Sequence, residues 1–447
     1  MLPAGPRDTA AASDPAQAMH EHALRQQLHN EIHARPFERL SAPALVSHMA
    51  FLADAAQQAQ AHEHLCRLLD DHHLPRPAAD SSFYSAQVGP VRLRWERHGE
   101  FVSYTVIRPG LPEAASEWFA GTAALALSES WRKAIPGALL CAIHVALPAE
   151  IAASRDWAAG DLDAVLDAEA LVASEVADAQ ARVFSDLHIH ADGFARFVVL
   201  TREISARRRG RLVQRLLEIE TYRLLALLTL PVARSIGPQL AGFERELAQI
   251  MDAIRSAEGE RDRPTLEQLS RLASAVEGLY AQHHARFTAA AAYYDLVGRR
   301  IQDLHEVPFG GLQSIGQFMD RRLSPAMQTC AHTARRLQGL SERISRCSNL
   351  LRTRVEVQMQ QQNRELLASM NRRQSLQLRL QQTVEGLSVA AITYYTSSLV
   401  GHLCAAAQPW LHIDPEVAQG WSIPGLALLV WLGLRRAHRH LMGAEGS

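Results

Sequence analysis

Residues 387–407, LSVAAITYYTSSLVGHLCAAA, contain no Asp, Glu, Lys or Arg. As a helix this segment would be about 31 Å long, which matches the hydrocarbon core of a bilayer. A second apolar segment, 422–434, is short, but extended back to Val417 it reaches the lower length limit for a span. The two segments predict a transmembrane hairpin over residues 387–434. The alternative is a hydrophobic hairpin buried in a soluble core.

The flanks of this hairpin predict its orientation. Arginines precede the first segment, and Arg435 and Arg436 follow the second. Positive residues mark the cytoplasmic side of a span, so both termini are predicted in the cytoplasm and the loop in the periplasm. The abundance of Arg over Lys is typical of GC-rich bacteria, which indicates a bacterial inner membrane. Residues 1–17 lack the apolar run of a signal peptide.

A long helix is predicted directly before the hairpin, over residues 324–386. Ser324 can cap it, with Pro325 at the first helical position. Apolar residues recur along it at a 3-4 spacing, which predicts a coiled-coil-like seam and a homo-oligomer assembled along the helix and hairpin. The register of this seam shifts after Gln358, which indicates a stutter. The seam residues are Leu323, Met327, Cys330, Ala334, Leu337, Ile344, Leu351 and Val355, then Leu366, Met370, Leu380 and Leu387.

Arginine exceeds acidic residues on this helix, with twelve Arg and four Glu from Arg321 to Glu385. One interpretation is a phosphate- or RNA-binding surface. The other is a solvated face and a positive flank for the membrane segment. The formal net charge of −1 provides no general attraction to nucleic acid, so no nucleic-acid partner is predicted.

Signals for β-strands are confined to the N-terminal part of the chain. Period-two alternation on both sides of Gly99 predicts a hairpin, and apolar runs elsewhere predict further strands. The candidate strands are 43–52, 91–96, 101–107, 138–147, 171–177, 181–190 and 193–201. Helices are predicted at 54–74 and, beyond Ser205, at 208–230, 236–257, 264–303 and 324–386.

These patterns predict an α+β protein with five parts. A disordered tail at 1–17 precedes a cytoplasmic α/β domain at 18–204 with a mixed sheet. A helical domain with a long stalk helix follows at 205–386. The transmembrane hairpin at 387–434 and a cytoplasmic basic tail at 435–447 complete the chain.

One N-terminal segment concentrates groups suited to acid–base chemistry or anion binding. It contains Asn30, Glu31, His33 and Arg35, and a carboxylate two residues from an imidazole could orient that ring. No nucleophile or glycine-rich phosphate loop lies beside it in the sequence. The alternative is a hydrogen-bonded connector that fixes the preceding short helix, predicted at 17–30, against the sheet.

Four positions near the membrane are further candidates. Glu385 lies at the entrance of the first predicted span, where it could pair with Arg379, with a neighbouring subunit or with lipid headgroups. Tyr394, Ser398 and His402 would line a pore if the hairpin formed a channel. The surroundings of these side chains would therefore distinguish a hairpin that only anchors the chain from one that lines a pore.

The sequence predicts no metal and no cofactor. His188 and His190 would share one face of a strand, as metal ligands must, but no cysteine pattern or HExxH motif completes a site. No Walker A loop, Rossmann fingerprint or GxSxG elbow occurs. The five cysteines form no CxxC pair, which fits a reducing compartment. The chain is therefore predicted not to be an enzyme.

Two stretches resemble a known family: LHNEIHARPFERLSAPALVSHMAF at 28–51 and LRLQQTVEGLSVAAITYYTSSLVGHL at 378–403. They are similar to a bacterial family of uncharacterised membrane-anchored proteins, a family defined by a domain of unknown function. The resemblance extends from about His20 to about His440. It implies a membrane anchor and brings no established activity.

Two weaker resemblances concern the layout at the C-terminus. The segment entering the hairpin is similar to the YagE family, which is linked to meiotic nuclear division. An α/β domain, a long helix and two C-terminal spans also resemble the CorA magnesium transporters. CorA proteins carry a Gly-Met-Asn signature at the end of the first span, where this chain has GHLCAAAQPW at 401–410.

The leading hypothesis is a non-enzymatic, oligomeric scaffold or sensor anchored in the bilayer. A second is a CorA-like channel or transporter that lacks the Gly-Met-Asn filter. A third is an enzyme that uses Glu31 and His33. The sequence sets neither the ligand nor the number of subunits.

Overall fold

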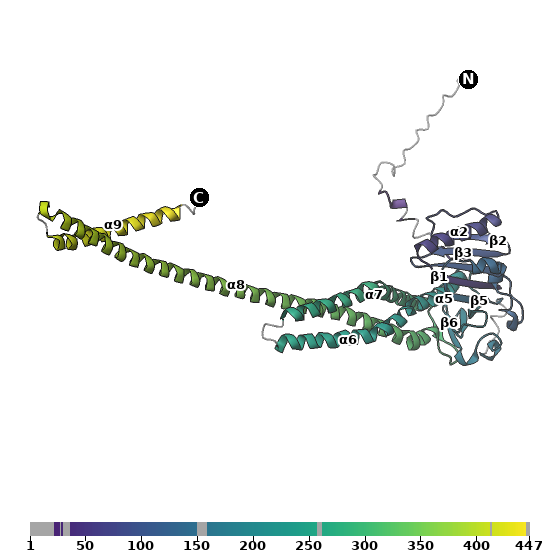
Figure 1. Cartoon of the computed structure of the whole chain (residues 1–447). Helices are drawn as coiled ribbons and strands as arrows, with labels where there is room; N and C mark the ends of the chain where they lie inside the picture. Colours follow the sequence, from purple (N-terminus) through teal and green to yellow (C-terminus); the bar gives the residue numbers. More distant parts are fainter. Residues whose placement is uncertain are drawn as a thin grey trace, which may run out of the picture. The chain divides into compact units, whose positions relative to one another are not determined.

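The computed structural model describes residues 22–26, 28–29, 36–149, 159–256, 262–411 and 414–443. The chain divides into two compact units (Figure 1). The first unit is Met1–Asp252 with Gln268–Ser345, and the second is Ala253–Glu267 with Arg346–Ser447. The predicted α+β class is confirmed, with a mixed sheet followed by long helices.

The first unit is built on a sheet in which nine described strands have the order β2-β3-β4-β1-β5-β8-β7-β6-β9. The pair β5–β8 is parallel and the other pairs are antiparallel, so the sheet is mixed. The strands are β1 (Ala44–Leu52), β2 (Phe83–Val88), β3 (Val91–Arg97), β4 (Phe101–Pro109), β5 (Ala138–Leu147), β6 (Val172–Val176), β7 (Ala181–Ser185), β8 (Ala195–Thr201) and β9 (Val307–Pro308).

The described helices differ greatly in length. They are α2 (Ala55–Asp71), α3 (Glu129–Lys133), α5 (Ala206–Leu227), α6 (Thr229–Ser256), α7 (Asp262–Leu304), α8 (Ile315–Leu411) and α9 (Pro415–Gly443). Short 3-10 helices lie at Ala115–Glu117, Ala123–Ala126, Ala159–Leu162 and Ala168–Ala170. The predicted helices at 54–74 and 208–230 correspond to α2 and α5.

Two helices cover opposite faces of the sheet. Successive side chains of a strand point to opposite faces. On β1, Leu45 and Met49 join the core that contains Leu65 and Leu69 of α2. On the other face of the same strand, His48 lies within hydrogen-bond distance of Thr221 on α5. The first unit is therefore a helix–sheet–helix sandwich over this part of the sheet.

The strand predictions missed β2 and β9 and overextended β7. Strand β2 lies at an edge and pairs only with β3 in the sheet order, and β9 consists of Val307 and Pro308, beyond the predicted α/β domain. The predicted strand 181–190 ends at Ser185, because the Asp186 carboxylate accepts backbone N–H groups from Asp167 and His188. Side-chain hydrogen bonds thus replace the ladder from that point.

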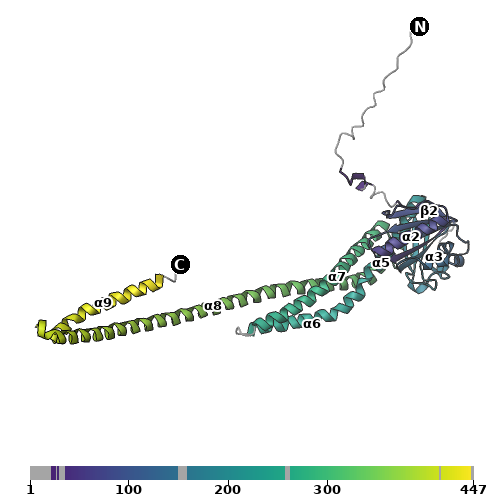
Figure 2. The ribbon, with the colours of Figure 1, turned by 45° about the horizontal axis from the view of Figure 1, so that its top comes forward.

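In the first unit, α6, α7 and α8 lie side by side (Figure 1 and Figure 2). Arg336 of α8 forms an ion pair with Glu244 of α6, with 2.7 Å between Nη2 and Oε2. Ser341 of α8 donates a hydrogen bond to Glu277 of α7. These contacts join the helices into one bundle.

The first half of the predicted oligomer seam is occupied within the chain. Leu337 and Ile344 are 1% and 2% exposed in the single chain. The prediction that these two residues hold copies together is wrong, because α6 and α7 already bury this stripe. A 3-4 spacing looks the same whether the partner helix belongs to the same chain or to another.

The start of α8 also differs from the predicted one at Ser324. The helix begins at Ile315, where the Ser314 hydroxyl accepts from Gln317 N–H and the Gln317 side chain accepts from Ser314 N–H. This capping box satisfies two backbone donors. Pro325 therefore lies inside α8, and the helix continues without a break through residues 387–407.

Candidate functional site

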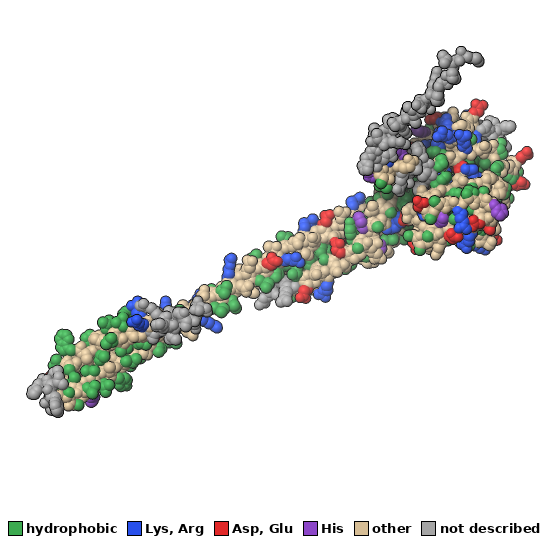
Figure 3. Space-filling model, turned by 90° about the horizontal axis from the view of Figure 1, so that it is seen from above, with side chains coloured by type: hydrophobic (Ala, Val, Ile, Leu, Met, Phe, Trp, Pro, Cys, Tyr) green, Lys and Arg blue, Asp and Glu red, His purple; other side chains and the backbone are tan. Residues whose placement is uncertain are grey.

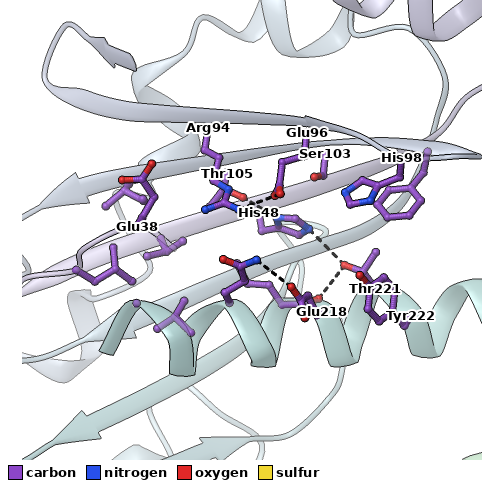
Figure 4. A pocket seen from close by; sticks show the side chains of 18 residues that line it. Glu38, His48, Arg94, Glu96, His98, Ser103, Thr105, Glu218, Thr221 and Tyr222 are labelled. Atoms are coloured by element: carbon purple, nitrogen blue, oxygen red, sulfur yellow. Dashed lines mark hydrogen bonds and ion pairs between the residues drawn. The ribbon is translucent and has the colours of Figure 1, made fainter. Parts of the chain in front are cut away.

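A small cavity of about 60 Å³ lies in the first unit between the sheet and α5 (Figure 4). Arg94 and Glu96 reach it from β3, and Ser103 and Thr105 reach it from β4. Strand alternation explains this placement, since the neighbouring residues on those strands face α2. Polar side chains thus occupy the face of the sheet that α5 buries, and buried polar groups require partners.

His48 lies at the centre of this polar cluster. Its Nδ1 is 2.8 Å from Thr105 Oγ1, and its Nε2 is 3.3 Å from Thr221 Oγ1. The Thr221 hydroxyl donates to the Leu217 carbonyl, so it accepts from His48 Nε2–H, while Nδ1 accepts from Thr105. Burial lowers the pKa of His48 to about 4. The ring is therefore neutral at pH 7 and is a poor general base there.

A buried ion pair lies beside the histidine. Arg94 Nη2 is 2.9 Å from Glu96 Oε1, and the two side chains are 4% and 11% exposed. Arg94 Nη1 also donates to the Pro36 carbonyl at 2.7 Å, and its guanidinium lies over the Phe83 ring. Burial by itself would raise the pKa of Glu96, but the hydrogen bond and charge of Arg94 hold it below its usual range. The Glu96 carboxylate therefore stays charged although it is buried.

The connector at residues 36–40 closes one end of the cavity. Glu38 accepts from Arg92 Nε at 2.6 Å, and Leu40 N–H donates to the Ala206 carbonyl at 3.0 Å. Gly210 of α5 touches this connector: a Cβ added there would lie 2.9 Å from the Glu38 carbonyl carbon and closer still to its oxygen. The connector can therefore cross α5 only where the helix has no side chain.

The charges around the cavity are balanced. Glu38 pairs with Arg92, Glu96 pairs with Arg94, and Glu218 pairs with Arg300. The Oε1 atom of Gln214 is buried without a hydrogen-bond partner, while its Nε2 donates to Glu218 at 2.9 Å. A volume of this size holds a few water molecules at most. The paired charges suit structural polar packing between the sheet and α5.

None of these cavity residues was predicted. The sequence signal that could have found them is the polar set on one side of two strands, Arg94 and Glu96 on β3 and Ser103 and Thr105 on β4. The predicted candidates Asn30, Glu31, His33 and Arg35 lie outside the described residues. Residues 36–40, whose hydrogen bonds are described above, follow these four candidates directly in the chain.

The predicted histidine pair does not form a joint site. His190 Nε2 lies 2.8 Å from Asp186 Oδ2, whereas His188 Nδ1 lies 3.6 Å from Asp167 Oδ2. Each imidazole therefore has its own carboxylate. Within the described ranges, no three His, Cys, Asp or Glu side chains come together to hold a metal ion.

In the second unit, the end of α8 and α9 form a helical hairpin with small and polar residues between them. Thr393 and Ser397 are 6% and 2% exposed, and with Gly401 they recur every four residues along one face of α8. A Cβ at Gly401 would lie 2.7 Å from Gln419 Oε1 of α9. The two helices therefore approach closely at this glycine.

The outer surface of the same hairpin is apolar. Figure 3 shows hydrophobic side chains spread over both helices. The large exposed residues are Ile392, Tyr394, Tyr395, Leu399 and Leu403 on α8, and Val417, Trp421, Ile423, Leu428, Leu429, Trp431 and Leu432 on α9. This distribution is the reverse of that in a water-soluble helical hairpin, which buries its large apolar residues.

Two helical segments in the described part of the chain are long and apolar enough to cross a membrane. Pro415–Arg436 has none of its most apolar window buried. Ala206–Arg255 has one third of it buried and belongs to the first unit as far as Asp252. The Ala206–Arg255 segment includes α5, which packs on the sheet. The predicted first span, 387–407, does not reach this level of hydropathy, because Ser, Thr and His interrupt it.

The four predicted membrane positions all lie on α8. Glu385 is half-buried, and Tyr394 is 70% exposed with its ring edge-to-face with Tyr395. His402 Nδ1 donates to the Ser398 carbonyl at 2.7 Å, which fixes its tautomer. Tyr394, Ser398 and His402 are spaced four residues apart, so they form a row beside the one that faces α9.

The comparisons with known proteins give a family and no activity. No curated protein and no solved structure matches the chain. Nothing in the comparisons supports the resemblance to the YagE family or to the CorA transporters. The family described as "Protein of unknown function (DUF3422)" matches residues 20–441, nearly the whole chain. The chain therefore belongs to the DUF3422 family.

Proposed function

We propose that this protein is a non-enzymatic scaffold or sensor that the α8–α9 hairpin anchors in the bacterial inner membrane. The observation that carries the proposal is the reversed polarity of the hairpin, with Thr393, Ser397 and Gly401 inside and large apolar side chains outside. In lipid, small residues let helices pack closely, while outward apolar side chains meet acyl chains. In water the same surface would be strongly unfavourable.

The dimensions and flanks of the hairpin support a bilayer. Pro415–Arg436 contains 22 residues, which is about 33 Å of helix. The Arg435 guanidinium lies over the Trp431 ring at 4.8 Å, a pairing suited to the membrane–water interface. With arginines at both ends of the hairpin, the proposal places both termini in the cytoplasm.

Alkaline carbonate extraction of cell membranes tests the anchor. We expect the full chain to stay in the membrane pellet and a Leu399→Arg, Leu429→Arg variant to move to the supernatant. Both substituted leucines are more than 60% exposed, so the hairpin need not repack. Leu378→Arg, at a comparably exposed position of α8 before the hairpin, is the matched control. Recovery of the unaltered chain in the supernatant would overturn the proposal.

We further propose that copies associate through α8 between the bundle and the hairpin. Leu366, Met370, Leu380 and Leu387 are 58–70% exposed there and follow a 3-4 spacing. Arg373 and Gln377 interrupt this row, but other arginines such as Arg379 lie beside it. Because anchors in one membrane would hold copies parallel, a second copy of the same helix is the partner that fits this row.

Light scattering of the detergent-purified chain, corrected for bound detergent, tests the association. Leu366→Asp with Leu380→Asp should reduce the mass to that of a monomer, because charges at these positions oppose a helix–helix seam. Leu378→Asp, off the row, should leave the mass unchanged. A monomeric unaltered chain, or equal masses for both variants, would rule out this interface.

A further inference from the structure

A second cavity in the first unit, of about 650 Å³, has walls of opposite charge. Asp167 and His188 lie on one wall, in the loops that flank β6 and β7, and Arg321 and Arg322 lie on the other, near the start of α8. Its volume falls in the range typical of small-molecule sites. The proposed anchoring and association make no use of it.

The acidic wall is held in place by a buried carboxylate. Asp186 is 1% exposed, and its Oδ2 accepts from Asp167 N–H at 2.9 Å and lies 2.8 Å from His190 Nε2. Its Oδ1 accepts from His188 N–H at 3.1 Å. Asp186 thus fixes the backbone of both Asp167 and His188. The Asp167 side chain itself remains about half exposed and can accept from a ligand.

The basic wall has two guanidinium groups available for a ligand. Arg321 and Arg322 are exposed on α8, and neither forms an ion pair or hydrogen bond with another described residue. Arg223 of α5 also lines the cavity, but it is bidentate with Glu220, with distances of 3.0 and 2.7 Å. Arg223 is therefore committed to the protein, whereas the two α8 arginines are not.

We propose that this cavity binds a phosphate ester that also carries an amino group. The planar forks of Arg321 and Arg322 match phosphate oxygens, and Asp167 on the facing wall matches an ammonium group. A ligand with only one of these groups would engage only one wall. The charge separation therefore selects a bipolar ligand over a simple anion.

Isothermal titration of the full-length, detergent-purified chain with phosphoethanolamine tests the site. We expect phosphoethanolamine to bind at least about tenfold more tightly than inorganic phosphate or ethanolamine, because each of those engages one wall. Arg321→Gln with Arg322→Gln should weaken phosphoethanolamine about tenfold or more. Arg271→Gln, an exposed arginine of α7 away from this cavity, should change nothing.

The Asp167→Asn variant tests the contribution of the acidic wall independently of the basic wall. This variant should lower the affinity for phosphoethanolamine to that for inorganic phosphate and leave phosphate itself unaffected. Failure of phosphoethanolamine to bind, or binding that the Arg321 and Arg322 variants do not weaken, would overturn the proposal. Displacement of bound phosphoethanolamine by phosphatidylethanolamine vesicles would identify a lipid headgroup as the source, and no displacement would identify a free metabolite.

Discussion

Replacement of Gly210 by alanine should destabilise the first unit, although alanine favours a helix. The added methyl group would overlap the Glu38 carbonyl and displace the connector at residues 36–40. That displacement breaks the backbone hydrogen bond from Leu40 N–H to the Ala206 carbonyl and the bond from Arg209 Nη1 to the Leu40 carbonyl, both 3.0 Å long. It also loosens the contact of Arg94 with the Pro36 carbonyl.

The magnitude follows from these contacts. One hydrogen bond between neutral backbone groups contributes about 1 kcal/mol, and the two from guanidinium donors contribute about 2 kcal/mol each. Alanine returns about 1 kcal/mol through helix propensity. The net loss in the free energy of unfolding should therefore be about 4 kcal/mol.

Gly278→Ala is the matched control for this prediction. Gly278 lies within α7, is exposed, and has no atom within 4 Å of an added Cβ. This variant should gain about 0.5–1 kcal/mol from helix propensity alone. Guanidinium titration of the detergent-purified chains measures both changes. If Gly210→Ala is as stable as Gly278→Ala, the connector does not depend on the missing side chain and the reasoning fails.

Three further predictions follow from buried groups. Arg94→Met should cost about 3–5 kcal/mol, because it leaves the Glu96 charge buried and unpaired, whereas Arg94→Met with Glu96→Leu should be close to neutral in the same denaturant titration. Burial lowers the pKa of His48 to about 4, while the unfolded imidazole titrates near 6.5. The unfolded state therefore binds more protons below pH 6.5, so stability should fall by about 2 kcal/mol from pH 6.5 to 5, and His48→Gln should flatten that part of the pH profile. Leu337→Asp should unfold the bundle, measured as lost helical circular dichroism, because the residue is 1% exposed. If the variant instead keeps its helical signal and dissociates to a monomer, Leu337 lies in an interface between copies and this prediction is wrong.

Local sequence patterns were sufficient for much of the sheet and for the order of the elements. The alternation on both sides of Gly99 predicted β3 and β4, which pair with Arg97 opposite Val102. Period two is a property of the extended backbone itself, so it can be read without knowing the partners. The same holds for α5, whose apolar stripe has the helical period.

The two C-terminal apolar segments could likewise be recognised from their length and their lack of charged residues. The lack of charged residues over 387–407 and the short apolar run after Val417 are visible in the sequence alone. Their arrangement, with Gly401 against Gln419 and the large side chains outward, depends on which faces of two helices meet. That choice results from packing between segments, which periodicity alone does not specify.

Only the tertiary structure decided what the polar and apolar faces contact. His48 and Thr221 are 173 residues apart in the chain, and no local pattern pairs them. The 3-4 row through Leu337 is equally compatible with a second copy and with α6 and α7, and the fold selected the latter. Hydrogen bonds to the Asp186 carboxylate likewise end β7 earlier than predicted. His190 contacts this carboxylate through its side chain, whereas His188 contacts it only through its backbone N–H. Sequence periodicity gives the face of an element, whereas the identity of its partner depends on long-range packing.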